Sequence, residues 1–286
     1  MNNKYWERVN SKFCYLYNKH SNMDKGGQIV YFSHGGGPLP ILGDPGHKEM
    51  VSFMRRLPNE IEKPNAIVVI SAHWEEEVPT VIESEKPVLL FDYYGFPKES
   101  YEIDYQLPGN TELVNMIKQV FKDSGAPLKV DNKRGLDHGV FIPLLLMYPE
   151  ADIPVTQISL IKGLDPSEHI HLGKMLRRLA DENILIIGSG FSFHNMRAFD
   201  WSGANNPDGN NDNFQNWLTD VCTGEYSDFE REGKLINWEK ATGARYCHPR
   251  EEHLLPLHVC CGAAKREGAI IFDNYILGKR AIAVKW

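Results

Sequence analysis

The chain has 286 residues, of which 42% are hydrophobic and 11% aromatic. This is enough for one large α/β domain or two small ones. The formal net charge of −7 does not favour nucleic acid or an anionic membrane as a partner. No apolar run approaches the roughly 20 residues that would span a bilayer.

Residues 1–27 are polar and aromatic and end in the breaker K-G-G, so we predict an N-terminal extension. They lack the apolar core of a signal peptide, which predicts a cytoplasmic protein. The five cysteines are an odd number without a C-x-x-C pair. Reduced thiols are therefore expected rather than disulfides or a cysteine zinc site. With no repeat and no shift in composition, residues 28–286 are predicted to form a single α/β domain.

Several apolar, β-branched runs have no alternating polar partners, which is typical of strands covered on both faces of a parallel sheet. We therefore expect an α/β fold with a central, mostly parallel sheet flanked by helices. The predicted strands are 28–33, 66–70, 78–82, 128–130, 155–160, 184–187, one near 270, and 281–284. The predicted helices are 47–57, 110–123, 140–148 with Pro143 in its first turn, 165–180, 213–222, 229–238 and 259–265; residues 92–106 and 202–213 are expected to be loops.

Three histidines, His34, His73 and His194, each follow one of these strand-like runs, and the strand at 66–70 is expected to end near His73. A parallel sheet brings such positions to one edge, beyond the carboxyl ends of its strands, where ligands bind. One such histidine is more often structural, but three at equivalent positions indicate a site. Histidine clusters without cysteine suit iron, zinc, copper or nickel. A further ligand is expected from the E-E-H run, either the carboxylate of Glu252 or the imidazole of His253.

Other chemistries are less well supported by the sequence. Ser189 lies in G-S-G rather than in a nucleophile elbow, and Cys260 and Cys261 lie in an apolar, helix-like run. The glycines after the first strand lack the spacing of a phosphate loop. His169 and His171, two residues apart on a predicted helix, point to different faces and are expected at the surface.

Five motifs occur in order along the chain: S-H-G-G-G-P, S-A-H-W, D-H-G, S-G-x-x-x-H-N and H-P-x-x-E-H-x-x-P-L-H-V. Together they resemble the class III extradiol ring-cleavage dioxygenases, in particular the single-chain 4,5-DOPA dioxygenase branch, which is related to the catalytic subunit of protocatechuate 4,5-dioxygenase. The resemblance covers roughly residues 29–286.

The resemblance implies a mononuclear metal, Fe(II) in active enzymes and sometimes Zn(II), with His34, His73 and His253 as ligands. His194 matches the histidine assigned acid/base work, which in some relatives also lies on the metal. His138 matches a second active-site histidine that orients substrate or dioxygen. The implied reaction inserts O2 into a small aromatic diol and gives a ring-opened semialdehyde.

Aromatic side chains are predicted to flank the flat ring of the substrate, in particular Trp74 and Tyr94. Two other functions use the same residues: a zinc-dependent hydrolase, in which the metal activates water, and a non-catalytic interaction protein with this fold. A homo-oligomer is compatible with the sequence. Neither nucleic acid nor a membrane is expected as a partner.

Overall fold

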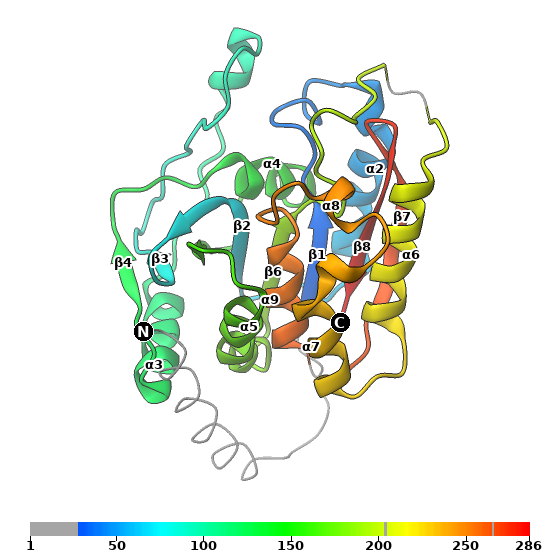
Figure 1. The fold of residues 1–286 in the computed structure, drawn as a ribbon. Helices are drawn as coiled ribbons and strands as arrows, with labels where there is room; N and C mark the ends of the chain where they lie inside the picture. Colours follow the sequence, from blue (N-terminus) through cyan, green and yellow to red (C-terminus); the bar gives the residue numbers. More distant parts are fainter. Residues whose placement is uncertain (1–27, 203–204, 265) are drawn as a thin grey trace.

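The structure, a computed structural model, describes residues 28–202, 205–264 and 266–286, so the predicted extension 1–27 lies outside it. In the described part, eight strands form one sheet in the spatial order β4-β3-β5-β2-β6-β1-β8-β7 (Figure 1). The strands are β1 (Ile29–Ser33), β2 (Ala66–Glu76), β3 (Thr80–Ile82), β4 (Lys129–Asp131), β5 (Val155–Ile161), β6 (Ile184–Gly190), β7 (Ala269–Ile276) and β8 (Lys279–Lys285).

The centre of the sheet is parallel: β6 pairs with β1 and with β2, and β2 pairs with β5. On one side β8 runs antiparallel to β1 and is joined by β7, while on the other side β3 runs antiparallel to β5. The predicted α/β fold with a mostly parallel sheet is confirmed. The carboxyl ends of β1, β6 and β2 consequently lie side by side.

Helices cover both faces of the sheet, which is why the central strands carry continuous apolar runs. Helix α9 lies directly on β1, β2 and β6, with α5 packed against it (Figure 1). Helix α4 contacts β2 and β6, and α2 contacts β7. The α-helices are α2 (Lys48–Arg56), α3 (Thr111–Ser124), α4 (His138–Met147), α5 (Pro166–Ala180), α6 (Gly209–Thr223), α7 (Asp228–Ile236), α8 (Ala244–Cys247) and α9 (Leu255–Ala263); short 3-10 helices are η1 (Pro45–His47), η2 (Leu57–Asn59), η3 (Lys98–Tyr101) and η4 (Trp238–Lys240).

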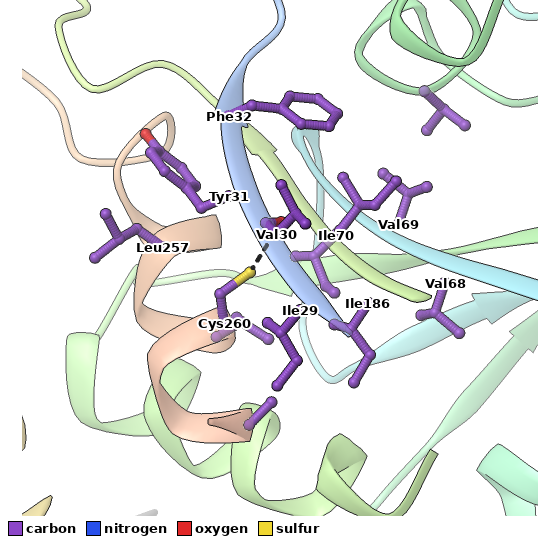
Figure 2. Close-up of a cluster of buried hydrophobic side chains, with 14 of the residues drawn as sticks. Ile29, Val30, Tyr31, Phe32, Val68, Val69, Ile70, Ile186, Leu257 and Cys260 are labelled. Atoms are coloured by element: carbon purple, nitrogen blue, oxygen red, sulfur yellow. Dashed lines mark hydrogen bonds between the residues drawn. The ribbon is translucent and has the colours of Figure 1, made fainter. Parts of the chain in front are cut away.

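The contact between α9 and β1 shows how the core holds the central strands in place (Figure 2). Every residue of β1 and of α9 is buried. Leu257 and Cys260 of α9 lie beside β1, and the Cys260 thiol donates a weak hydrogen bond to the carbonyl oxygen of Val30 at 3.6 Å. Burial raises the pKa of this thiol well above its ordinary value, so Cys260 is a packed core residue. A frame of this kind fixes the strand ends from which the site is built.

Local signals explain where the helices begin and end. Asn110 caps α3 by accepting a hydrogen bond from the backbone N–H of Leu113, and Gly125 ends this helix with a φ of 73°. Helix α6 begins at Gly209, inside the predicted loop 202–213, because the Asp208 carboxylate caps it by accepting from the N–H of Asn211. Among the described residues, no helix is both long and apolar enough to cross a bilayer.

The prediction that His169 lies at the surface is wrong, since its side chain is completely buried. Its Nδ1–H donates to the Asp165 carbonyl oxygen at 2.7 Å, and its Nε2 accepts from the Ile161 N–H at 3.1 Å. The spacing of two residues excludes a shared metal site with His171 but does not specify exposure. His171 itself is half-buried.

Candidate metal centre

The five histidines singled out in the sequence come together at the carboxyl edge of the sheet. His34 follows β1, His73 belongs to the end of β2, and His194 follows β6. His138 is the first residue of α4, and His253 precedes α9. The ring centroids of His34 lie 4.8 Å from His73, 5.3 Å from His253 and 5.5 Å from His138. The strand order therefore gathers residues that are far apart in the chain.

Three of these side chains form a group that could hold one ion: the ligand atoms of His34, His73 and His253 all lie within 4.8 Å of one another. The Nε2 atoms of His34 and His73 are 3.0 Å apart. Two nitrogens bound to one ion at about 2.1 Å lie about 3 Å apart when the angle between them is near 90°. The donor set and its spacing fit a transition-metal ion.

Burial keeps these imidazoles neutral, which is the form that binds a metal. The pKa of His34 and that of His73 are both lowered well below the ordinary value of 6.5, first by burial and then by the neighbouring histidines. Burial, followed by the charge of His194, lowers the pKa of His253 to about 3. Three neutral imidazoles with converging nitrogens are thus present before any ion binds.

His73 reaches the cluster through an irregularity in β2, and this strand runs on past His73, where the sequence predicted its end. The strand continues to Glu76. Its pairing with β5 jumps from Ile70 opposite Ile158 to Glu75 opposite Leu160. The extra residues on β2 form a bulge, and bulges re-aim side chains at the edges of active sites. The sequence pattern did not show this, because the apolar run ends at Ile70 and the polar residues that follow it, Ser71 and His73, resemble the start of a loop.

Glu252 lies behind the cluster, between two histidines. Its Oε1 accepts from Nδ1 of His253 at 2.9 Å and lies 3.2 Å from Nδ1 of His194, whose ring stacks on that of His253 with centroids 3.3 Å apart. Burial opposes the charge of Glu252, but these histidine contacts outweigh it and lower its pKa. Because Glu252 engages Nδ1, it leaves Nε2 of His253 available. This geometry favours His253 over Glu252 as the third ligand.

Asp92 likewise lies beside two histidines of the cluster, His138 and His73, and the sequence analysis did not predict it. Its Oδ1 accepts from the backbone N–H of His138 at 3.0 Å and from Nδ1 of His138 at 2.8 Å, and its Oδ2 lies 3.9 Å from Nδ1 of His73. Burial raises the pKa of Asp92, but the hydrogen bonds from His138 outweigh burial and the net pKa is lowered. Asp92 lies 46 residues before His138, so no local motif links them.

The segment that follows Asp92 extends away from the sheet with η3 at its tip (Figure 1, upper left). Tyr93 packs edge-on against His138 with ring centroids 5.7 Å apart, and Phe96 packs on Tyr93 at 5.6 Å. Tyr94, by contrast, is 91% exposed. Trp74 is buried: its indole N–H donates to Glu76 at 3.0 Å, and Arg134 covers its ring. The role of Trp74 and Tyr94 in substrate binding stays a prediction.

The mostly parallel sheet and the histidine cluster at its carboxyl edge define the class: an α/β metalloenzyme. The family model for the catalytic LigB subunit of aromatic ring-opening dioxygenase matches residues 29–279, and the chain belongs to this family. The resemblance inferred from the motifs is thereby confirmed, and the protein is an extradiol ring-cleavage dioxygenase.

Individual relatives match most of the chain. It is 41% identical to dioxygenase tasH of Hapsidospora irregularis, over 87% of this chain and 82% of that protein. It is 39% identical to a 4,5-DOPA dioxygenase extradiol of Beta vulgaris (83% and 87%) and 30% identical to one of Escherichia coli K12 (82% and 84%). A crystal structure of an uncharacterized protein from Escherichia coli K12 superposes with a TM-score of 0.73 at 26% identity, over 91% of this chain and 99% of that one.

Proposed function

We propose that the protein uses Fe(II) and O2 to cleave a catechol next to its diol, giving a ring-opened semialdehyde. The observation that carries the proposal is the convergence of His34, His73 and His253 as buried, neutral imidazoles. Histidine ligation with open positions suits non-heme iron that binds oxygen and substrate. Since several relatives are named for 4,5-DOPA cleavage, DOPA is the first catechol to test.

In this proposal His34, His73 and His253 hold the ion. When bound, Fe(II) supplies a Lewis acid that lowers the pKa of a catechol hydroxyl and a common centre for the diol and O2. That centre is shielded from bulk water on one side, because two of the ligand side chains, His34 and His253, are almost completely buried, whereas the His73 side chain is 22% exposed. Shielding from water strengthens the electrostatic interactions on the buried side.

His194 is the proposed acid and base. Its Nδ1 faces the ionised Glu252 at 3.2 Å, so Nε2 is the nitrogen that accepts the second catechol proton. Its side chain is 20% exposed, more than that of His253, which suits a group that meets substrate. His138 is held by Asp92 through Nδ1 and the backbone. We assign it the orientation of a substrate oxygen.

The decisive experiment is anaerobic reconstitution with Fe(II), followed by oxygen uptake and absorbance of the yellow product over a panel containing DOPA, catechol and substituted catechols. Uptake with at least one diol is expected. No uptake with any diol would refute the proposal. Activity restored by Zn(II) but not by Fe(II) would favour the hydrolase, and absence of stoichiometric metal binding would favour the non-catalytic interaction protein.

Two variants separate the proposed ligands from the proposed base. His73→Ala should lose the metal, whereas His194→Ala should retain it and lose about 10²–10⁴-fold in turnover, as is usual for a general acid or base. Metal content and turnover are measured on the same preparations. Equal loss of metal in both variants would make His194 a ligand.

The remaining expectations complete the proposal: one catalytic domain over residues 28–286, a cytoplasmic location and a possible homo-oligomer. They stay predictions. Sedimentation of the full chain tests the last of them.

A further inference from the structure

A proline inside α4 leaves one carbonyl group of that helix without its usual donor. In an α-helix the carbonyl oxygen of residue 139 accepts from the N–H of residue 143, and Pro143 has no N–H. The expectation that Pro143 lies in the first turn is wrong, because α4 begins earlier, at His138. The oxygen of Gly139 is instead bonded by the hydroxyl of Ser189, at 2.5 Å.

This bond decides how Ser189 meets His34. A carbonyl oxygen only accepts, and a serine hydroxyl has a single hydrogen, so that hydrogen is committed to Gly139. The Ser189 Oγ lies 3.0 Å from Nδ1 of His34 and must therefore accept from it. The proton of the neutral His34 ring is thus on Nδ1. Its lone pair is on Nε2, the atom that lies 3.0 Å from Nε2 of His73.

Close packing keeps the three elements in this arrangement. Ser189 is completely buried and lies on β6 between Phe32 of β1 and Ser71 of β2. Gly139 lets the start of α4 approach these strands, since a Cβ there would lie 2.5 Å from the Ser71 hydroxyl oxygen and 3.2 Å from the His73 ring. The Ser189 hydroxyl therefore has the Gly139 oxygen and the His34 ring as its partners in a fixed setting.

We propose that Pro143, Gly139 and Ser189 form a positioning relay that holds His34 in the Nδ1–H tautomer and so presents Nε2 to the metal. The inference rests on the metal site of the proposed function and adds residues that do not touch the ion. Such partners of metal-binding histidines fix the ring and its tautomer, and their loss typically costs about 10–100-fold in metal affinity.

The relay is tested by ¹⁵N NMR of the histidine rings in the metal-free protein, together with an anaerobic Fe(II) titration. Ser189→Ala should reduce the Nδ1–H fraction of His34 and weaken metal binding by about 10–100-fold. Ser192→Ala is the matched control: its buried hydroxyl accepts from the N–H of Ile282 at 2.9 Å and is not a partner of the His34 ring, whose Nδ1 meets Ser189. It should lower stability but leave the His34 tautomer and metal affinity unchanged.

Pro143→Ala separates positioning from stability. Alanine supplies the missing N–H to Gly139 and suits a helix interior better than proline, so the thermal stability should not fall. A carbonyl oxygen can accept two hydrogen bonds, so this N–H competes with the Ser189 hydroxyl for the Gly139 oxygen and weakens that bond. The Nδ1–H fraction of His34 and the metal affinity should therefore decrease by less than in Ser189→Ala.

Two results would overturn the relay: an unchanged His34 tautomer in Ser189→Ala, or an equal loss of metal affinity in Ser192→Ala. An unchanged tautomer in Pro143→Ala would remove Pro143 from the relay. The NMR measurement needs neither metal nor turnover. Failure of the relay is therefore distinguishable from failure of the wild-type protein to bind Fe(II) or to cleave catechols.

Discussion

Gly190→Ala tests whether the end of β6 sets the position of His253. A Cβ at residue 190 would lie 2.1 Å from the carbonyl oxygen of His253. Non-bonded carbon and oxygen atoms need more than about 3 Å, so this carbonyl must move by about 1 Å. The same oxygen accepts from the Phe191 N–H at 3.0 Å and from the Tyr31 hydroxyl at 3.2 Å. Both bonds are buried and would be strained or lost.

The expected cost follows from these contacts. Two buried hydrogen bonds at about 1 kcal/mol each, plus overpacking of about 1–3 kcal/mol, give a loss of about 3–5 kcal/mol in the free energy of unfolding. For a chain of this size each kcal/mol lowers Tm by about 2–4 °C. A shift of about 1 Å at a positioned group can also cost about 10²-fold in turnover. Both Tm and the Fe(II) affinity should therefore fall.

Calorimetry and anaerobic metal titration measure the two effects on one preparation. Gly233→Ala is the control, because it lies inside α7 with no atom within 4 Å of its added Cβ. It should raise stability by up to about 1 kcal/mol and leave metal binding unchanged. If Gly190→Ala kept the wild-type Tm and metal affinity, the reasoning that the Gly190 contact positions His253 would be refuted.

Three further predictions concern other parts of the structure. Asp92→Asn should lower turnover by about 10–100-fold, because it weakens the hydrogen bonds that hold His138. Asp104→Asn on the same segment is the control, since Asp104 bonds only Gln106 in the described structure and its loss should leave turnover unchanged; equal effects in steady-state kinetics would contradict the prediction. Burial lowers the pKa of His169 from 6.5 to about 4. The unfolded chain therefore binds the proton first as the pH falls. The free energy of unfolding should decrease between pH 6.5 and about pH 4, by up to about 3 kcal/mol more than in His169→Leu. Urea unfolding at several pH values measures this, and equal pH slopes would count against it. Finally, Fe(II) at about 100 times its Kd should stabilise the metal-free protein by about 2.7 kcal/mol; thermal scans of His73→Ala should show no such shift.

The sequence alone determined the fold class and predicted most of the histidine cluster. Unbroken apolar runs such as 66–70 identify strands covered on both faces, because a strand buried on both sides has no polar alternation. Parallel strands bring their carboxyl ends to one edge, so histidines at the ends of three runs predicted a cluster there. The sequence could predict the positions of His34, His73 and His194 in this way, because each histidine follows its strand closely in the chain.

The tertiary structure alone decided how these histidines are held. Asp92 meets His138 across 46 residues, and Ser189 meets Gly139 across 50. His169 is buried although its local pattern suggested the surface. Local periodicity reports which face of an element is apolar, whereas hydrogen-bond partners depend on which distant segments pack together. The proposed tautomer of His34 is the clearest case, because it rests on a proline in one helix and a serine at the end of one strand.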